Sequence, residues 1–216
     1  MKPVQLHGRH QSVFWTTIFL IIAVSAACNN SSPTEPEFGP GPTGPIGPQD
    51  SGIDGSGVFV EENRPVSGFA AIRLTSVASV FVEQSGSESL AVRAEDNVIS
   101  HILTEVIGGV LEITTEAGVS FDDIGPIQVF VTARDLSRIE LDGVGDIQVM
   151  GLSFRELGLT LNGTGDMDLT GLDGEQLEVS MDGVGQIAVE GRVTEQTVRV
   201  SGVGDYKGKK LRSVRA

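Results

Sequence analysis

Cysteine is almost absent from this chain of 216 residues, since Cys28 is the only one, and no disulfide can form within the chain. Aromatic residues make up only 5% of the sequence, with one tryptophan and one tyrosine. Basic residues are also few: 15 lysines and arginines stand against 29 aspartates and glutamates, for a net charge of -14. Phosphate binding requires clustered lysine and arginine, so this balance argues against a nucleic-acid partner.

The usual motifs of catalysis are missing. The sequence contains no Gly-x-Ser-x-Gly elbow, no P-loop and no His-Glu-x-x-His motif. After residue 27 the only histidine is His101, for which a surface or packing role is expected. We therefore expect a protein that is not an enzyme, with no catalytic residues, no metal site and no cofactor.

Only one stretch is strongly apolar, and it lies near the N-terminus. Lys2 and Arg9 precede the run SVFWTTIFLIIAV, which is too short to span a bilayer comfortably and is followed by small residues. Residues 1–27 are therefore predicted to be a signal peptide. Their removal leaves 13 basic and 29 acidic residues, a net charge of -16.

The sequence SAAC, which ends at Cys28, resembles the lipobox of bacterial lipoproteins, although Ser25 stands where that pattern usually has leucine. The resemblance implies cleavage before Cys28 and attachment of lipid to its thiol, with more than one acyl chain needed for stable anchoring. The alternative is an ordinary secretory signal with an incidental cysteine. A lipid-anchored protein of a bacterial membrane is expected, in the outer membrane and facing either the periplasm or the cell surface.

Two further regions follow. Residues 28–57 hold most of the prolines and almost no residues to bury, which is typical of an extended tether. Residues 58–216 show apolar residues at every second position, as in IQVFV, and this period predicts half-buried strands. Within this domain the segment EDNVISHILTEV has helical spacing, and Asp96 could cap a short helix there.

A unit of about twenty residues repeats in the second half of the domain. Each unit has a strand, a Gly-x-Gly corner and a second strand, and the corner glycines are Gly143 and Gly145, Gly163 and Gly165, Gly183 and Gly185, and Gly202 and Gly204. Such corners require glycine either for a positive φ or for close approach to the neighbouring unit. Stacking of the units would bury their apolar faces, so an all-β parallel solenoid similar to a right-handed β-helix is expected. An antiparallel meander is the alternative.

The corner sequences GVGD, GTGD, GVGQ and GVGD, together with the opening that starts at Arg64, resemble the head GIN domain of auto-transporter adhesin-like proteins. The resemblance implies a β-helix fold and a lipoprotein of the cell envelope. The last unit departs from the pattern, because Gly208 and Lys210 replace an apolar residue and a glycine. The resemblance therefore also implies that the domain is truncated at its C-terminus.

Acidic residues flank the corners in two columns. A repeated turn with oxygen ligands can bind calcium, but asparagine, glutamine and serine interrupt both columns, which favours a structural role in the turns. The first column is Asp146, Asp166, Gln186 and Asp205, and the second is Asp142, Asn162, Asp182 and Ser201.

These observations indicate a non-enzymatic envelope lipoprotein that presents an acidic surface for adhesion or assembly. A glycan-binding or glycan-processing protein and a periplasmic scaffold or sensor are the alternatives. The expected partners are a membrane, reached through Cys28, and an unidentified protein or glycan, together with end-to-end self-association.

Overall fold

Strands make up 71% of the structure, a computed structural model that describes residues 52–215. Cys28 and most of the predicted tether lie outside the described residues. Among the described residues no helix is long and apolar enough to cross a membrane. The strands are β1 (Ile53–Asp54), β2 (Phe59–Arg64), β3 (Ala71–Leu74), β4 (Val77–Gln84), β5 (Ser89–Glu95), β6 (Ile102–Ile107), β7 (Val110–Thr115), β8 (Phe121–Asp122), β9 (Gln128–Ala133), β10 (Arg138–Leu141), β11 (Val144–Leu161), β12 (Thr164–Met181), β13 (Val184–Val200) and β14 (Val203–Arg215).

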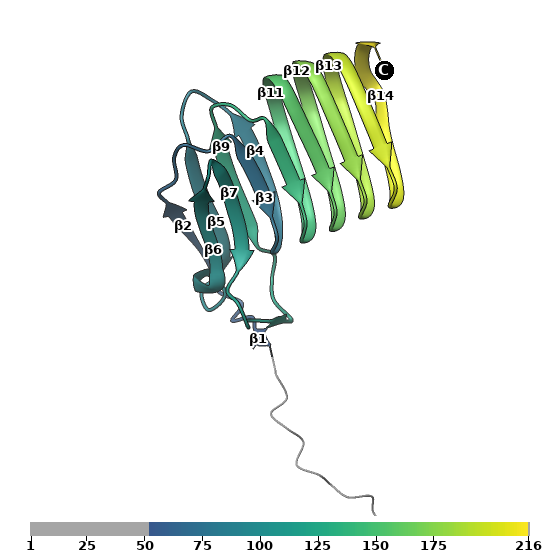
Figure 1. Cartoon of the computed structure of the whole chain (residues 1–216). Helices are drawn as coiled ribbons and strands as arrows, with labels where there is room; N and C mark the ends of the chain where they lie inside the picture. The colour runs from purple at the N-terminus through teal and green to yellow at the C-terminus, as the bar shows by residue number, and fades with distance from the viewer. Residues whose placement is uncertain (1–51, 216) are drawn as a thin grey trace, which may run out of the picture. The chain divides into compact units, whose positions relative to one another are not determined.

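Twelve of these strands belong to one mixed sheet, and β1 and β8 form a separate two-stranded sheet. The main path runs β2-β5-β9-β4-β11-β10-β3-β7-β6, and β12, β13 and β14 continue from β11 (Figure 1). Strand β11 is long and bent: residues 144–150 pair with β4, whereas residues 158–161 pair with β10. The sheet therefore turns back around its own core.

The expectation of a parallel β-solenoid is wrong. The sheet is nearly closed and barrel-like, and it mixes parallel with antiparallel strands. Three pairs, β2 with β5, β5 with β9 and β6 with β7, are antiparallel. The repeated glycine units correctly predicted only the parallel pairing of β11 to β14. The strands before them include antiparallel pairs that the repeat does not predict.

The short helix expected around Asp96 is also wrong. Only Ile99–His101 is helical, as one 3-10 turn, and the chain then enters strand β6. The apolar spacing in this segment does not distinguish a helix from a strand, because β-branched residues such as Ile102, Val106 and Ile107 also favour a strand. In the strand Ile102 faces the core and Leu103 faces solvent.

A tight hairpin explains why that segment is a strand. Gly108 and Gly109 connect β6 to β7, with φ angles of 59° and 82°. Positive φ at both central residues is typical of the type I′ turn that joins antiparallel strands, and two glycines adopt it without steric cost. The pair therefore fixes the register in which Ile107 faces Val110.

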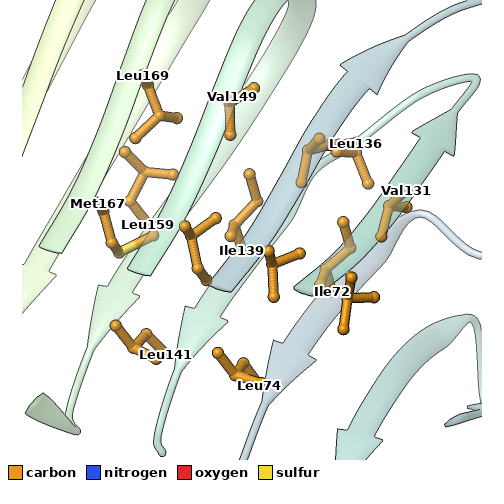
Figure 2. Packing of buried hydrophobic residues seen from close by; sticks show 14 of the residues in the cluster. Ile72, Leu74, Val131, Leu136, Ile139, Leu141, Val149, Leu159, Met167 and Leu169 are labelled. Atoms are coloured by element: carbon orange, nitrogen blue, oxygen red, sulfur yellow. The ribbon is translucent and has the colours of Figure 1, made fainter. Parts of the chain in front are cut away.

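The core consists of aliphatic side chains that stack from strand to strand. Ile139 in β10 pairs with Ile72 on one side and Leu159 on the other, and all three are at most 1% exposed. Figure 2 shows their side chains beside one another, with Leu74 and Leu141 in the neighbouring position. Each strand thus contributes every second residue to one continuous interior.

The eight corner glycines lie where the backbones of successive strands approach most closely. A Cβ atom on Gly163 would overlap the carbonyl oxygen of Gly143, and one on Gly165 would overlap that of Gly145. The second glycine of each corner also has a positive φ, which is 144° at Gly165. The amides of Asn162 and Gly163 both donate to the Leu141 carbonyl, at 2.9 Å each.

Close approach at the corner predicts a large effect of Gly165→Ala. The added methyl group would collide with the backbone of Gly145, and alanine would have to adopt a positive φ that is unfavourable for it. We therefore expect a loss of about 3 kcal/mol or more in the free energy of unfolding. Gly158→Ala is the matched control, because its nearest neighbour would be 3.9 Å away and it should change stability by less than about 1 kcal/mol. Urea unfolding measures both, and similar effects would contradict the corner geometry.

Tyr206 in β14 is half-buried, and its hydroxyl donates a hydrogen bond to Gln196 Oε1 at 2.8 Å. Burial raises the pKa of its phenol. As the pH rises, the phenol of Tyr206 therefore ionises in the unfolded chain at a lower pH than in the folded protein. Its contribution to the free energy of unfolding is complete below about pH 10 and is lost as the pH rises toward the pKa of the folded state.

Because Tyr206 is the only tyrosine, absorbance at 295 nm can follow its ionisation alone. We expect the midpoint to be higher in the native protein than in the protein unfolded in urea. Tyr206→Phe should abolish this signal and flatten part of the loss of stability above about pH 10. Equal midpoints in the two states would contradict a buried phenol.

Candidate attachment point and binding groove

A buried carboxylate lies beneath residues 55–57, a few residues after the start of the described chain. Glu95, at the end of β5, is only 5% exposed. Its two carboxylate oxygens accept hydrogen bonds from the amides of Gly57, at 2.8 Å, and Gly125, at 3.0 Å. A Cβ atom on Gly55 would overlap this carboxylate, so glycine allows the chain to pass directly over it.

The two residues after Glu95 extend this attachment. The hydroxyl of Ser56 donates to Asp96 Oδ1 at 2.5 Å, and its amide donates to Asn97 Oδ1 at 3.1 Å. The side-chain nitrogen of Asn97 donates in turn to the carbonyl of Asp54 at 2.7 Å. We call residues 54–57 together with Glu95, Asp96 and Asn97 the attachment point. Residues 54–57, assigned by composition to the tether, thus lie on the domain.

A shallow groove of about 510 Å³ crosses β10, β11, β12 and β13. Arg138, Gly158 and Glu178 occupy the same position in successive strands, and Gly158 leaves the middle of that row open. Glu156 and Glu195 line its other side. An adjoining hollow of about 350 Å³ shares Glu156 with it. The groove is open and is lined by polar and apolar atoms alike, which suits the binding of an extended ligand.

Next to the groove an arginine neutralises a group of carboxylates. Arg73 Nε lies 2.6 Å from Glu140 Oε2 and 3.4 Å from Asp142 Oδ2, and its Nη1 lies 3.6 Å from Glu112 Oε1. The hydrogen bond to Glu140 and the surrounding carboxylates raise the pKa of Arg73. The guanidinium therefore stays charged and links β3 to β7, through Glu112, and to β10 and its end, through Glu140 and Asp142.

The acidic columns beside the corners bind the backbone of the next strand. Asp146 Oδ1 accepts the amide hydrogen of Asp166 at 3.1 Å, and Asp166 Oδ1 accepts that of Gln186 at 2.9 Å. In the second column the contact is between side chains, and Asn162 Nδ2 donates to Asp142 Oδ1 at 2.8 Å. Within residues 52–215 no group of three or more His, Cys, Asp or Glu side chains is placed to hold a metal ion.

His101 has a local partner. Its Nδ1 lies 2.7 Å from Glu116 Oε2, which is supplied by the segment after β7. This contact links the 3-10 turn to the end of the β6–β7 hairpin. Neither residue is among those that line the groove.

Sequence reasoning found the corner glycines and the acidic columns but missed the groove, the attachment point and the Arg73 cluster. Glu95 and Gly125 are distant in sequence and carry no motif. One signal was visible: the triplet Val-Phe-Val occurs in both β4 and β9, with phenylalanine at the position that faces away from the core. It places Phe81 beside Phe130.

The fold and the groove define an all-β domain with an open, polar surface. The chain belongs to the family described as "Putative auto-transporter adhesin, head GIN domain", which it matches over residues 68–216. The membership is consistent with an exported protein of the cell envelope. Adhesins, and not enzymes, are what the family description names.

Solved structures show the same fold. A "putative adhesin" from Bacteroides fragilis is 25% identical, with a TM-score of 0.73 over 75% of this chain and 76% of the other. A "putative lipid binding protein" from Parabacteroides distasonis is 21% identical, with a TM-score of 0.64 over 76% and 78%. A "putative adhesin" from the same organism is 18% identical, with a TM-score of 0.57 over 76% and 78%. No curated protein matches the chain.

The hydrogen bonds of the acidic column predict different effects for two neighbouring aspartates. Asp166→Ala removes the acceptor for the Gln186 amide, whereas Asp168→Ala removes the same charge from an exposed side chain of the same strand. We expect Asp166→Ala to be less stable than Asp168→Ala by about 1 kcal/mol in urea unfolding. Equal stability of the two variants would contradict the structural role of the column.

Proposed function

We propose that this protein is a lipid-anchored, adhesin-like protein of the bacterial cell envelope that acts by binding and not by catalysis. Cys28 carries the lipid, the Pro/Gly-rich residues that follow form a spacer, and the domain presents its surface to a partner. The family match and the adhesin-like solved structures support the adhesin-like part of this proposal.

The attachment point is the observation that carries the proposal. A domain that holds a ligand while it is tied to a membrane must transmit load through the residue at which its tether ends. Here residues 54–57 are bonded to Glu95, Asp96 and Asn97, about forty residues later in the chain, by the hydrogen bonds described above. Several such bonds must break together before the tether can peel from the domain, because they lie in one short segment.

The groove supports binding as the activity. Its walls come from four strands of one continuous sheet, so its side chains are held in fixed positions by the strand register. Pre-organised side chains lower the entropic cost of binding an extended ligand. A periplasmic scaffold or sensor would use the same features, and the location of the domain distinguishes the two functions.

The test combines anchoring and location. We expect the full-length protein to incorporate labelled palmitate and to sediment with membranes, and protease added to intact cells should digest the domain. Cys28→Ser should lose the label and leave the membrane fraction, because no acyl chain then holds it. Ser31→Ala, a change of similar size in the same segment, is the matched control and should behave as the wild type.

Two outcomes would contradict the proposal. Label and membrane association that persist in Cys28→Ser would exclude this residue as the lipid site. A domain that resists protease on intact cells but is digested after lysis would exclude adhesion at the cell surface, and would favour the periplasmic scaffold.

A further inference from the structure

Two phenylalanines form a stacked pair on the outer face of the sheet. Phe81 in β4 and Phe130 in β9 pair directly across the strands, with ring centroids 5.2 Å apart and planes inclined by 17°. Their neighbours Val80 and Val129 are fully buried, so the alternation of the strands turns both rings outward. Phe130 remains 37% exposed.

Strand β5, next to Phe130, has a small side chain beside the aromatic pair, so the surface is lower on that side. In β5 the residue that pairs with Phe130 is Ala91, which carries only a methyl group, and in β2 the next residue along is Asn63. On the other side of the pair, Gln148 in β11 lies beside Phe81. The aromatic pair therefore lies in a row between two exposed amide side chains, Asn63 and Gln148.

Further polar side chains lie in the adjacent row of the same face. Arg93 in β5 pairs with Gln128 in β9, and Gln128 pairs with Ser79 in β4. Within the described part of the chain, the amides of Asn63, Gln128 and Gln148 make no side-chain hydrogen bonds to other protein groups. They keep both donors and acceptors available to a ligand.

We infer that this face, made by Phe81, Phe130, Ala91, Asn63, Gln128 and Gln148, is a binding platform for a neutral saccharide. A pyranose ring with equatorial hydroxyls has an apolar face of axial C–H groups, which packs on an aromatic ring. Its hydroxyls require amide donors and acceptors around that ring, as the platform provides. The alternative is a pair that only stabilises the sheet, which would need neither the low point at Ala91 nor the unbonded amides.

Charge selects among saccharides. The chain carries a net charge of -14, and Glu61 and Glu83 lie on the same face of the sheet as the platform. Repulsion opposes the approach of a polyanionic glycan, so uronic-acid polymers are disfavoured relative to neutral ones. A saccharide ligand deepens the proposed function and rests on it, because an adhesin requires a ligand on the surface that it reaches.

The test uses the full chain in a detergent without a sugar headgroup, titrated calorimetrically with cellohexaose, laminarihexaose and xylohexaose. Hexagalacturonate is the acidic counter-probe. We expect at least one neutral hexasaccharide to bind and the acidic one not to bind. Phe130→Thr should weaken that binding about tenfold, the upper range for the loss of one aromatic contact.

A second variant separates the platform from the stability of the fold. Ala91→Leu keeps both phenylalanines and fills the space beside Phe130, so it should also weaken binding about tenfold or more, while the thermal unfolding midpoint stays close to that of the wild type. Val144→Thr is the matched control, since it removes an exposed apolar side chain at a corner where the next unit has Thr164. It should bind as the wild type does.

Three results would overturn the inference: no binding of any neutral probe, an affinity that neither Phe130→Thr nor Ala91→Leu changes, or tighter binding of hexagalacturonate. None of these depends on where the domain lies in the cell. A domain accessible on intact cells that binds no saccharide would leave the proposed function standing with a ligand of another class. Saccharide binding by a domain that is protected until lysis would leave the platform standing without surface adhesion.

Discussion

Hydrogen bonding between the backbones of successive corners is the constraint on which the second half of this domain depends. At each corner one carbonyl accepts two amide hydrogens from the next unit, as Leu141 does from Asn162 and Gly163, and Leu161 does from Asp182 and Gly183. Beside these hydrogen bonds the chains approach so closely that a Cβ atom on a corner glycine would overlap the backbone of the preceding unit. The glycines are thus the condition for the register, and the register aligns the remaining side chains of β11 to β14.

Alignment in register has an electrostatic consequence, because the same position of each unit recurs about every 4.8 Å. Two carboxylates at that distance repel by roughly 0.9 kcal/mol even in water. The structure reduces this cost in two ways. Asp146 and Asp166 accept backbone amides, which spreads their charge, and Asn162 places an amide against Asp142. An acidic surface therefore coexists with close stacking.

The part of the fold that was predictable from sequence is the part that repeats. Alternation in IQVFV and the spacing of the corner glycines gave the strands and their local geometry, since both depend on neighbouring residues. The antiparallel pairing of β2 with β5 was not predictable, because it joins segments with unrelated sequences. The attachment point was not predictable for the same reason. In the sequence Glu95 resembles any polar residue at the end of a strand, and only the fold brings Gly57 and Gly125 to it. The groove likewise was not predictable, because Gly158 forms its open centre only when Arg138 and Glu178 of the neighbouring strands lie on either side of it.

The same constraint separates the residues that fix the fold from those that are free to bind. Inward side chains fill the core, and a Cβ atom on any corner glycine would overlap neighbouring backbone, whereas outward side chains contact only other groups on the surface. A change there alters the surface at a known place and leaves the register intact. Exposed aromatic rings such as Phe130 are not required by this arrangement, because polar residues occupy equivalent outward positions, as Gln148 and Asp168 do in β11 and β12. An aromatic pair at such positions therefore has its explanation in what the surface contacts, and the fold serves to hold it in place.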